Sequence, residues 1–127
     1  MINPPEQAET QSSRSKGTDN ESLAIEYIIA KGYTILKRNF KFGKSGEIDI
    51  IAKYGELIVF FEVKSRKSFE YGSPIESVPP SKRKSIYNAA RGYLYVNKIE
   101  SADCRFDFIG IDLRKAQPEI THIENAF

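Results

Sequence analysis

The sequence has few of the residues that mark redox, zinc or membrane chemistry. Its only cysteine, Cys104, excludes an intramolecular disulfide and indicates a reducing compartment. Its only histidine, His122, is accompanied by no Cys/His cluster and by no nucleophile, which disfavours a zinc site and a general-base role. No apolar run is long enough for a membrane helix, and the polar first residues do not resemble a signal peptide. We therefore expect a soluble, cytoplasmic protein without membrane contact.

Length and charge are compatible with one small domain. The 127 residues are enough for a core of about five strands and two or three helices. Residues 1–17 are almost entirely polar and predict a disordered tail, which leaves residues 18–127 as the folded domain. The formal net charge of +2 is too small to indicate nucleic-acid binding by itself.

The stretch from residue 46 to residue 66 predicts a β-hairpin at the centre of the fold. Two short runs rich in Ile, Val and Phe, residues 48–52 and 57–63, flank a glycine-containing link at residues 54–56. Runs of this length and composition favour strands over helices. Charged residues therefore interrupt a segment that is otherwise apolar enough for a core.

Strand periodicity predicts how these charged side chains are arranged. Because side chains alternate between faces, Glu47, Asp49 and Ile51 are expected on one face of the first strand. Glu62 and Lys64 are expected on one face of the second strand. We assume the register in which the two faces coincide, since a slip of one residue would separate them.

Two interpretations account for carboxylates on a central hairpin. A buried carboxylate costs several kcal/mol unless it is paired or bound to a metal, and carboxylate oxygens suit Mg²⁺ or Mn²⁺. Lys64 would then lie beside the metal and hold a water molecule. The alternative is a set of cross-strand salt bridges on an exposed sheet face. The apolar residues around Asp49 and Glu62 favour the metal site.

The same residues resemble a known signature. Asp49 followed on the next strand by Glu62, Val63 and Lys64 is similar to the PD-(D/E)xK motif of restriction-endonuclease-like nucleases. Ile48 stands where that motif has proline. Holliday-junction-resolvase-like members of the superfamily also lack this proline. More closely, GEIDIIA and FFEVKSR, together with KGYTILKRNF, YGSP, RFDFIGI and NAF, resemble the YraN family of small bacterial proteins over residues 20–127.

The resemblance implies a fold and a function. The expected fold is α/β, a restriction-endonuclease-like core in which helices flank a mixed sheet of about five strands. The implied activity is metal-dependent hydrolysis of phosphodiester bonds in DNA, possibly branched or structured DNA. Asp49, Glu62 and the carbonyl of Val63 would hold Mg²⁺ (or Mn²⁺), Lys64 would orient the water, and Glu21 and Glu47 would be outer or second-metal ligands. Two alternatives stay open: a non-catalytic nucleic-acid-binding protein on a nuclease scaffold, and an adaptor that needs no metal.

Glu21 belongs to the first predicted helix, which opens at residues 18–21 and runs to about Lys31, with Gly32 as its stop. It has two possible roles. As the third helical residue of a capping box with Thr18 it would only close the helix terminus. As a residue of the apolar stripe it would point inward, toward the metal.

Basic residues near the hairpin are the candidate contacts to nucleic acid. Arg38 is a candidate for phosphate or for a salt bridge to Glu47 or Asp49. Ser81 is predicted to cap a second helix, whose free N–H groups and basic first turn would cradle phosphate. The full set of basic candidates is Arg38, Lys41, Arg66, Lys82, Arg83 and Lys84.

The remaining segments receive structural assignments. Residues 33–42, 105–113 and 120–123 are predicted strands, the last at a sheet edge, and Asp107 is expected to pair with Arg105 or Lys64. Residues 68–80 read as a loop that could cover substrate, with Phe69 and Tyr71 as base-stacking or anchoring residues. A homodimer would suit a junction-cleaving enzyme, but the sequence contains no clear self-association surface.

Overall fold

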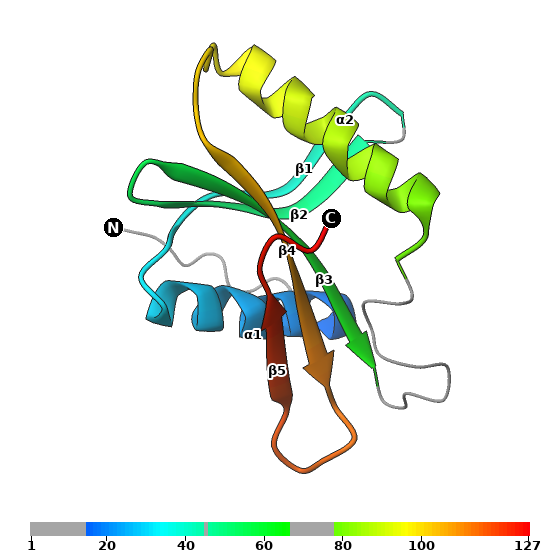
Figure 1. The fold of residues 1–127 in the computed structure, drawn as a ribbon. Coiled ribbons are helices and arrows are strands. Elements are labelled where there is room, and N and C mark those ends of the chain that lie inside the picture. Colours follow the sequence, from blue (N-terminus) through cyan, green and yellow to red (C-terminus); the bar gives the residue numbers. More distant parts are fainter. Residues whose placement is uncertain (1–14, 45, 67–77) are drawn as a thin grey trace.

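The protein folds as a five-stranded sheet between two helices in the part that the structure describes (Figure 1). The structure is a computed structural model, and it describes residues 15–44, 46–66 and 78–127. The elements in chain order are α1 (Ser15–Ala30), β1 (Thr34–Phe42), β2 (Gly46–Tyr54), β3 (Leu57–Arg66), α2 (Pro80–Val96), β4 (Cys104–Asp112) and β5 (Glu119–Ile123). The predicted α/β class is therefore confirmed.

The sheet is mixed because one of its connections crosses over. Its strand order is β1-β2-β3-β4-β5, and neighbouring strands are antiparallel except for the parallel pair β3 and β4. A parallel pair needs a long connection, and α2 supplies it. The two edge strands are β1 and β5, so the predicted edge position of the last strand is confirmed.

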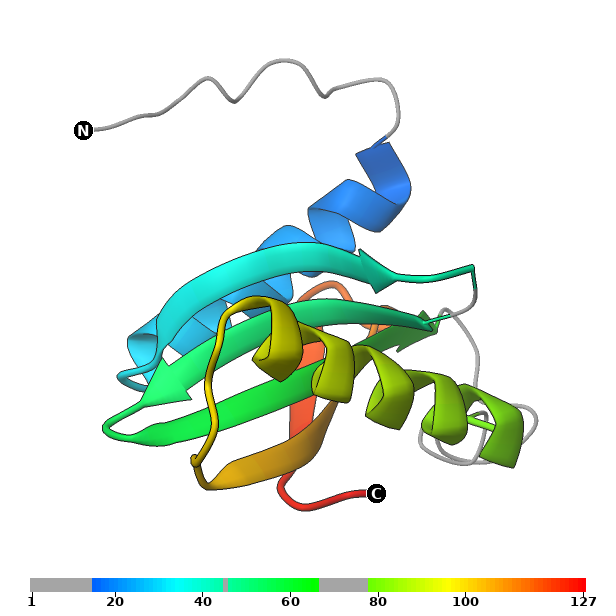
Figure 2. The same ribbon diagram turned by 90° about the horizontal axis from the view of Figure 1, so that it is seen from above.

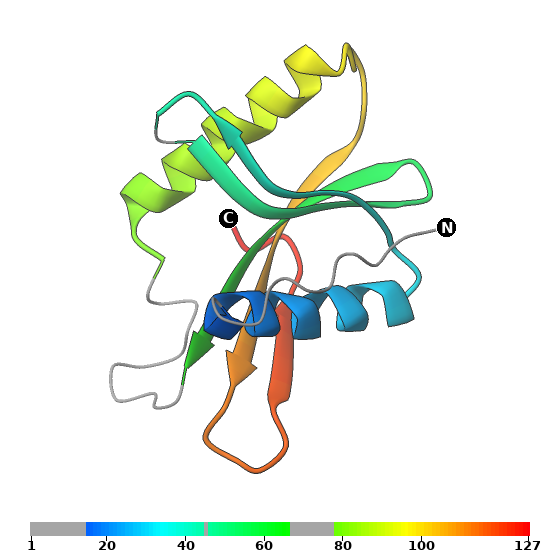
Figure 3. The ribbon, with the colours of Figure 1, turned by 180° about the vertical axis from the view of Figure 1, so that it is seen from behind.

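The helices cover opposite faces of the sheet, as Figure 2 shows from above. Helix α1 packs Ala24 and Ile28 against one face, and Figure 3 shows it lying across that side. Helix α2 packs Ile86, Ala89 and Ala90 against the other face. Each helix therefore buries one apolar stripe on a two-sided sheet, which gives the domain two core layers.

Both predicted turn signals act as expected. Tyr54 pairs with Leu57, and Gly55 adopts a left-handed φ of 61°, as a two-residue hairpin turn requires. Gly32 follows α1 with a φ of 101°, and its amide donates to the carbonyl of Ile29. The hairpin and the end of the first helix are thus encoded locally.

Both helix starts differ from the prediction. Helix α1 begins at Ser15, so Glu21 lies well inside it and the capping-box role is wrong. Residues 1–14 of the expected tail lie outside the described residues, as does the 67–77 segment with Phe69 and Tyr71. Helix α2 begins at Pro80, not at a Ser81 cap. Proline is favoured at the first helical position because its φ is already helical and it has no N–H to satisfy.

The alternation of faces along β2 is broken at Asp49. Ile48 and Ile51 pack on the α2 face, whereas Ile50 packs on the α1 face. The period-two pattern predicted for residues 47–51 is therefore wrong. The register of β1 with β2 places Asn39 opposite Asp49, and Asn39 has a left-handed φ of 52°. Asparagine tolerates this conformation better than most residues do, which explains how β1 accommodates a kink opposite the break in β2.

None of the helices in the described part is long and apolar enough to cross a membrane.

Candidate functional site

Asp49 and Glu62 meet where the pairing of β2 and β3 ends. The register of these strands runs from Tyr54 and Leu57 at the turn to Ile50 and Phe61. Just beyond this last pair, the backbone amide of Val63 donates a hydrogen bond of 2.8 Å to Oδ2 of Asp49. The Glu62 carboxyl is also hydrogen-bonded to Asp49. The structure therefore brings together the two acids that the sequence assigned to the metal.

Burial perturbs both carboxyls, and the charge of Asp49 adds to the effect on Glu62. The Glu62 side chain is 3% exposed, and its burial, followed by the charge of Asp49, raises its pKa to about 8. Burial also raises the pKa of Asp49, although the amide of Val63 counteracts the rise. At neutral pH the pair therefore holds a proton, with the Glu62 acid donating to the Asp49 carboxylate.

Two lysines approach this acid pair from different elements. Nζ of Lys82, in the first turn of α2, lies 4.0 Å from Oε1 of Glu62. Lys64 is two residues beyond Glu62 on β3, and its charge also lowers the pKa of Glu62. Oε1 of Glu62 is nevertheless buried without a hydrogen-bond partner among the described residues. The pair thus has nearby positive charge but one oxygen that is not satisfied.

Glu21 lies on the α1 side of the acid pair. Its pKa is raised by burial and then by the charge of Asp49, so the two carboxyls are close enough to interact. Nη2 of Arg38 lies 3.7 Å from Oε1 of Glu21, and Asn39 hydrogen-bonds the same side chain. The expected salt bridge from Arg38 to Glu47 or Asp49 is therefore wrong: the partner is Glu21.

The acids do not form a complete cage for a metal. Within residues 15–44, 46–66 and 78–127, no three His, Cys, Asp or Glu side chains lie close enough together to hold an ion. Glu21 and Glu47 are therefore not brought into one ligand set with Asp49 and Glu62. Mg²⁺, however, is commonly held by only one or two carboxylates plus waters and substrate phosphates. Asp49 and Glu62, with the unsatisfied Oε1, fit that mode.

The N-terminus of α2 offers fewer free backbone donors than the phosphate cradle that the sequence predicts. Pro80 has no N–H, and the amides of Lys82 and Arg83 donate to the carbonyl of Pro79. The Arg83 side chain donates to the carbonyl of Val78 and lies 5.3 Å from the ring centroid of Phe127. Arg83 thus has structural contacts, and phosphate binding at this terminus stays a prediction.

The role of the other basic candidates as nucleic-acid contacts stays a prediction. Lys41 and Lys84 are exposed, and Arg66 is half-buried at the end of β3. Lys82 points at Glu62, which the sequence could not reveal because twenty residues and a crossover separate them. Asn39, which hydrogen-bonds Glu21, was missed altogether, because a strand pattern assumes a regular backbone.

Comparisons with known proteins identify the family of the chain. The model of "Uncharacterised protein family UPF0102" matches residues 20–111. The chain belongs to this family. A UPF0102 protein of Clostridioides difficile is 43% identical over 91% of this chain and 98% of its own length. One of Chlorobium limicola is 50% identical over 76% and 74%, and one of Dehalococcoides mccartyi is 37% identical over 89% and 93%. The resemblance to YraN is thereby confirmed.

A second polar cluster in this UPF0102 chain is structural. Asp107 is fully buried and accepts a 2.8 Å hydrogen bond from Nε of Arg105, which confirms the predicted pair. His122 places Nε2 2.7 Å from Oδ2 of Asp107 and Nδ1 3.2 Å from the Tyr27 hydroxyl. These bonds keep the pKa of Asp107 below its usual value despite burial. The histidine that looked solitary in the sequence therefore helps to satisfy the hydrogen-bonding capacity of a buried aspartate.

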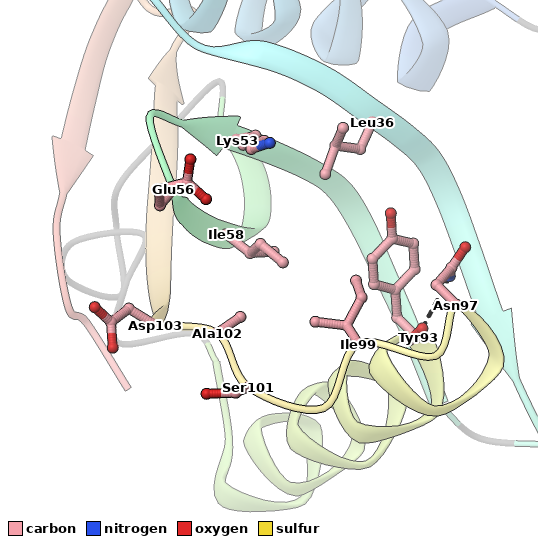
Figure 4. A pocket seen from close by; sticks show the side chains of 10 residues that line it. All are labelled: Leu36, Lys53, Glu56, Ile58, Tyr93, Asn97, Ile99, Ser101, Ala102 and Asp103. Carbon is pink, nitrogen blue, oxygen red and sulfur yellow. Dashed lines mark hydrogen bonds between the residues drawn. The ribbon is translucent and has the colours of Figure 1, made fainter.

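The UPF0102 fold also has a hollow at the turn end of the β2–β3 hairpin (Figure 4). It encloses about 680 Å³ and contains none of the predicted site residues. Its charged lining has both signs: Lys53 faces it together with Glu56 and Asp103. Two carboxylates and one lysine do not suit a polyanion, so this hollow is not part of the candidate site.

Proposed function

We propose that this protein hydrolyses phosphodiester bonds of nucleic acid, DNA in the first place, with the help of a divalent metal. One observation carries the proposal: the carboxyl of part-buried Asp49 lies beside that of buried Glu62, whose Oε1 lacks a hydrogen-bond partner among the described residues. A purely structural pair would be expected to satisfy its buried oxygens. An arrangement that leaves one unsatisfied and shares a proton suits a site that exchanges this proton for a cation.

Asp49 and Glu62 are the residues that would hold Mg²⁺ or Mn²⁺, and the carbonyl of Val63 stays a predicted third ligand. When bound, the ion would polarise the scissile phosphate and lower the pKa of a bound water. The amide of Val63 fixes the Asp49 carboxylate before any ligand arrives, which reduces the ordering cost of binding.

The two lysines supply positive charge on the side where phosphate would bind. Lys64 follows Glu62 by two residues, so the period of the strand puts both on the same side of β3. There its ammonium would contact a phosphate oxygen or the attacking water. Lys82 would balance the charge of Glu62 once the proton has left. Glu21, half-buried beside Asp49, would act only through water.

The test combines metal titration with cleavage assays. We expect Mn²⁺ to bind the wild-type protein and not Asp49→Ala, as measured by calorimetry. We expect cleavage of duplex, single-stranded or branched DNA to be lost in Glu62→Ala and Lys64→Ala while DNA binding is retained. Lys53→Ala removes an exposed lysine at the turn end of β2 that is not a candidate contact; it is the matched control and should cleave normally. Equal Mn²⁺ binding in wild type and Asp49→Ala would exclude the metal site. Binding of DNA without cleavage would favour a non-catalytic nucleic-acid-binding protein.

A further inference from the structure

Helix α2 has a second stripe in addition to the one in the core. Its core stripe faces the sheet and consists of Ile86, Ala89, Ala90 and Tyr93. The second stripe follows the same helical spacing of i, i+3, i+4 and i+7 and consists of Asn88, Arg91, Gly92 and Tyr95. Core packing does not explain this second set, because Tyr95 is 80% exposed.

Gly92 in this stripe makes room for an aromatic ring from β1. A Cβ at Gly92 would lie 2.2 Å from Cγ of Phe42, so the ring of Phe42 lies directly over the glycine. Glycine is unfavourable inside a helix, and the close approach of this ring explains why it is present. Phe42 remains 41% exposed. The protein thus holds an aromatic ring in a fixed position at its surface, near a second exposed ring, that of Tyr95.

These residues line a pocket of about 420 Å³ between the β1–β2 connection and α2, whose elements lie side by side in Figure 1. The lining of this pocket contains two cations, Lys44 and Arg91, and no carboxylate. Nη2 of Arg91 donates a 2.6 Å hydrogen bond to Oδ1 of Asn88. This bond uses the amide oxygen of Asn88, so its amide nitrogen is the end that can donate to a ligand.

We propose that this pocket, the Phe42–Tyr95 pocket, binds an unpaired base of single-stranded nucleic acid. The inference rests on the function proposed above, because it names the form of nucleic acid that the site would take. Phe42 and Tyr95 supply the surfaces on which a base stacks, and Lys44 and Arg91 supply the positive charge that attracts its phosphates. Asn88 would donate to a base edge.

The charge of the pocket argues for nucleic acid and against a second copy of the chain. In a two-fold dimer the same patch faces itself, so Lys44 and Arg91 of one protomer would face the same cations of the other. Like charges at an interface are unfavourable, whereas a polyanion neutralises them. The exposed aromatic residues therefore suit a base better than a self-association surface.

The position of the pocket connects it to the acid pair. Gly46 lines the pocket and lies three residues before Asp49 on β2, about 10 Å along the strand. Asn88 lies six residues after Lys82 on α2, about 9 Å along the helix. The path along β2 and the path along α2 both lead to the acid pair, because Asp49 lies on β2 and Lys82 of α2 approaches Glu62. A strand anchored in the pocket would place a phosphate at the acids roughly three stacked nucleotides away, at about 3.4 Å each.

Fluorescence anisotropy of labelled DNA tests this inference without any cleavage. A single strand of about 12 nucleotides and the duplex of the same sequence are titrated with the full chain in EDTA. We expect Tyr95→Ala and Phe42→Ala each to weaken single-strand binding roughly 5- to 100-fold and duplex binding less than twofold. Tyr95→Phe keeps the ring and should bind as the wild type does. Tyr54→Ala removes a tyrosine that is 51% exposed at the hairpin turn, and it should leave binding unchanged.

Several outcomes would overturn the inference, and they differ from failure of the proposed function. Unchanged single-strand binding in folded Tyr95→Ala and Phe42→Ala would exclude the base pocket, even if the wild type cleaves DNA. Equal losses for duplex and single strand would assign the patch to general electrostatic binding. A sedimentation shift from dimer to monomer in Tyr95→Ala, without loss of DNA binding, would assign the patch to a second copy. Selective loss of single-strand binding in a protein that never cleaves would support the pocket and contradict only the nuclease.

Discussion

The backbone amide of Val63 donates a 2.8 Å hydrogen bond to the side chain of Asp49, at the point where β2 and β3 stop pairing. A carboxylate oxygen thus accepts from an amide that a regular ladder would pair with a strand carbonyl. The bond holds Asp49, which is part-buried, beside the buried carboxyl of Glu62. The raised pKa values of Asp49 and Glu62 follow from this one local departure from regular β-structure.

Replacing Asp49 by asparagine should separate charge from geometry. Asp49→Asn retains an oxygen that can accept from Val63 but removes the negative charge that helps to raise the pKa of Glu62. We therefore expect the pKa of Glu62 to fall below about 8. Carbon-13 NMR of the Glu62 carboxyl measures it directly. Glu47→Gln is the control and should leave the value near about 8, since Glu47 is not among the main groups that shift the pKa of Glu62. An unchanged value in Asp49→Asn would contradict the pairing of the two acids.

The raised pKa of Glu62 makes stability depend on pH in a defined direction. Between the ordinary value of 4.5 and about 8, the folded protein keeps a proton that the unfolded chain has released. The free energy of unfolding should therefore fall as pH rises through this interval and level off above it. Glu62→Gln cannot ionise and should show a smaller fall, while the raised pKa of Asp49 contributes in the same direction in both proteins. Urea unfolding at several pH values measures the difference; parallel curves for the two proteins would refute it.

Metal binding should have the opposite dependence on pH. A divalent ion must displace the shared proton, so below a pKa of about 8 the affinity for Mn²⁺ should rise with pH, roughly tenfold per unit. Above that value it should level off. Calorimetry in two buffers of different ionisation enthalpy would detect the release of about one proton per ion at pH 7. Affinity that stays constant between pH 6 and 8 would show that the ion does not bind at Glu62.

Loss of Asp107 should destabilise the fold without touching the candidate site. Asp107→Ala leaves the guanidinium of Arg105 without its buried partner, which typically costs about 3–5 kcal/mol. The matched variant Asp103→Ala removes an exposed aspartate just before the same strand and should stay within about 0.5 kcal/mol of the wild type. Denaturant unfolding gives both values. Mn²⁺ affinity of folded Asp107→Ala should be unchanged, and its loss would mean that the two clusters are coupled.

The two helix ends provide a matched pair of stability tests. Gly32 and Lys98 occupy equivalent positions after α1 and α2, with left-handed φ of 101° and 57°. In both, the next residue donates back to the helix: Tyr33 to Ile28 and Ile99 to Leu94. We expect Gly32→Ala to cost about 1–2 kcal/mol and Lys98→Gly to stabilise by up to about 1 kcal/mol. Thermal unfolding would measure both, and a stabilising Gly32→Ala would contradict the role of the backbone conformation.

The candidate site divides into a part that could be read from the sequence and a part that could not. Asp49 and Glu62 are equally far from the Gly55 turn, so a tight hairpin alone brings them together. The kink at Asn39, opposite Asp49, could not be predicted, because a period-two pattern assumes a regular strand. The cap of α2 was predicted wrongly, since Pro79 and Pro80 start the helix earlier than Ser81 does.

The sequence by itself determined the strands, the hairpin with its acids and the stop at Gly32, because turn geometry and residue periodicity act over a few neighbouring residues. The family also followed from the sequence, through the motifs that it contains. Only the tertiary structure decided the contacts of Lys82 with Glu62, Arg38 with Glu21, and His122 with Asp107. Each of these pairs joins different elements. Their distances depend on how the helices pack on the sheet and where the strands bend, and local sequence signals do not encode these quantities.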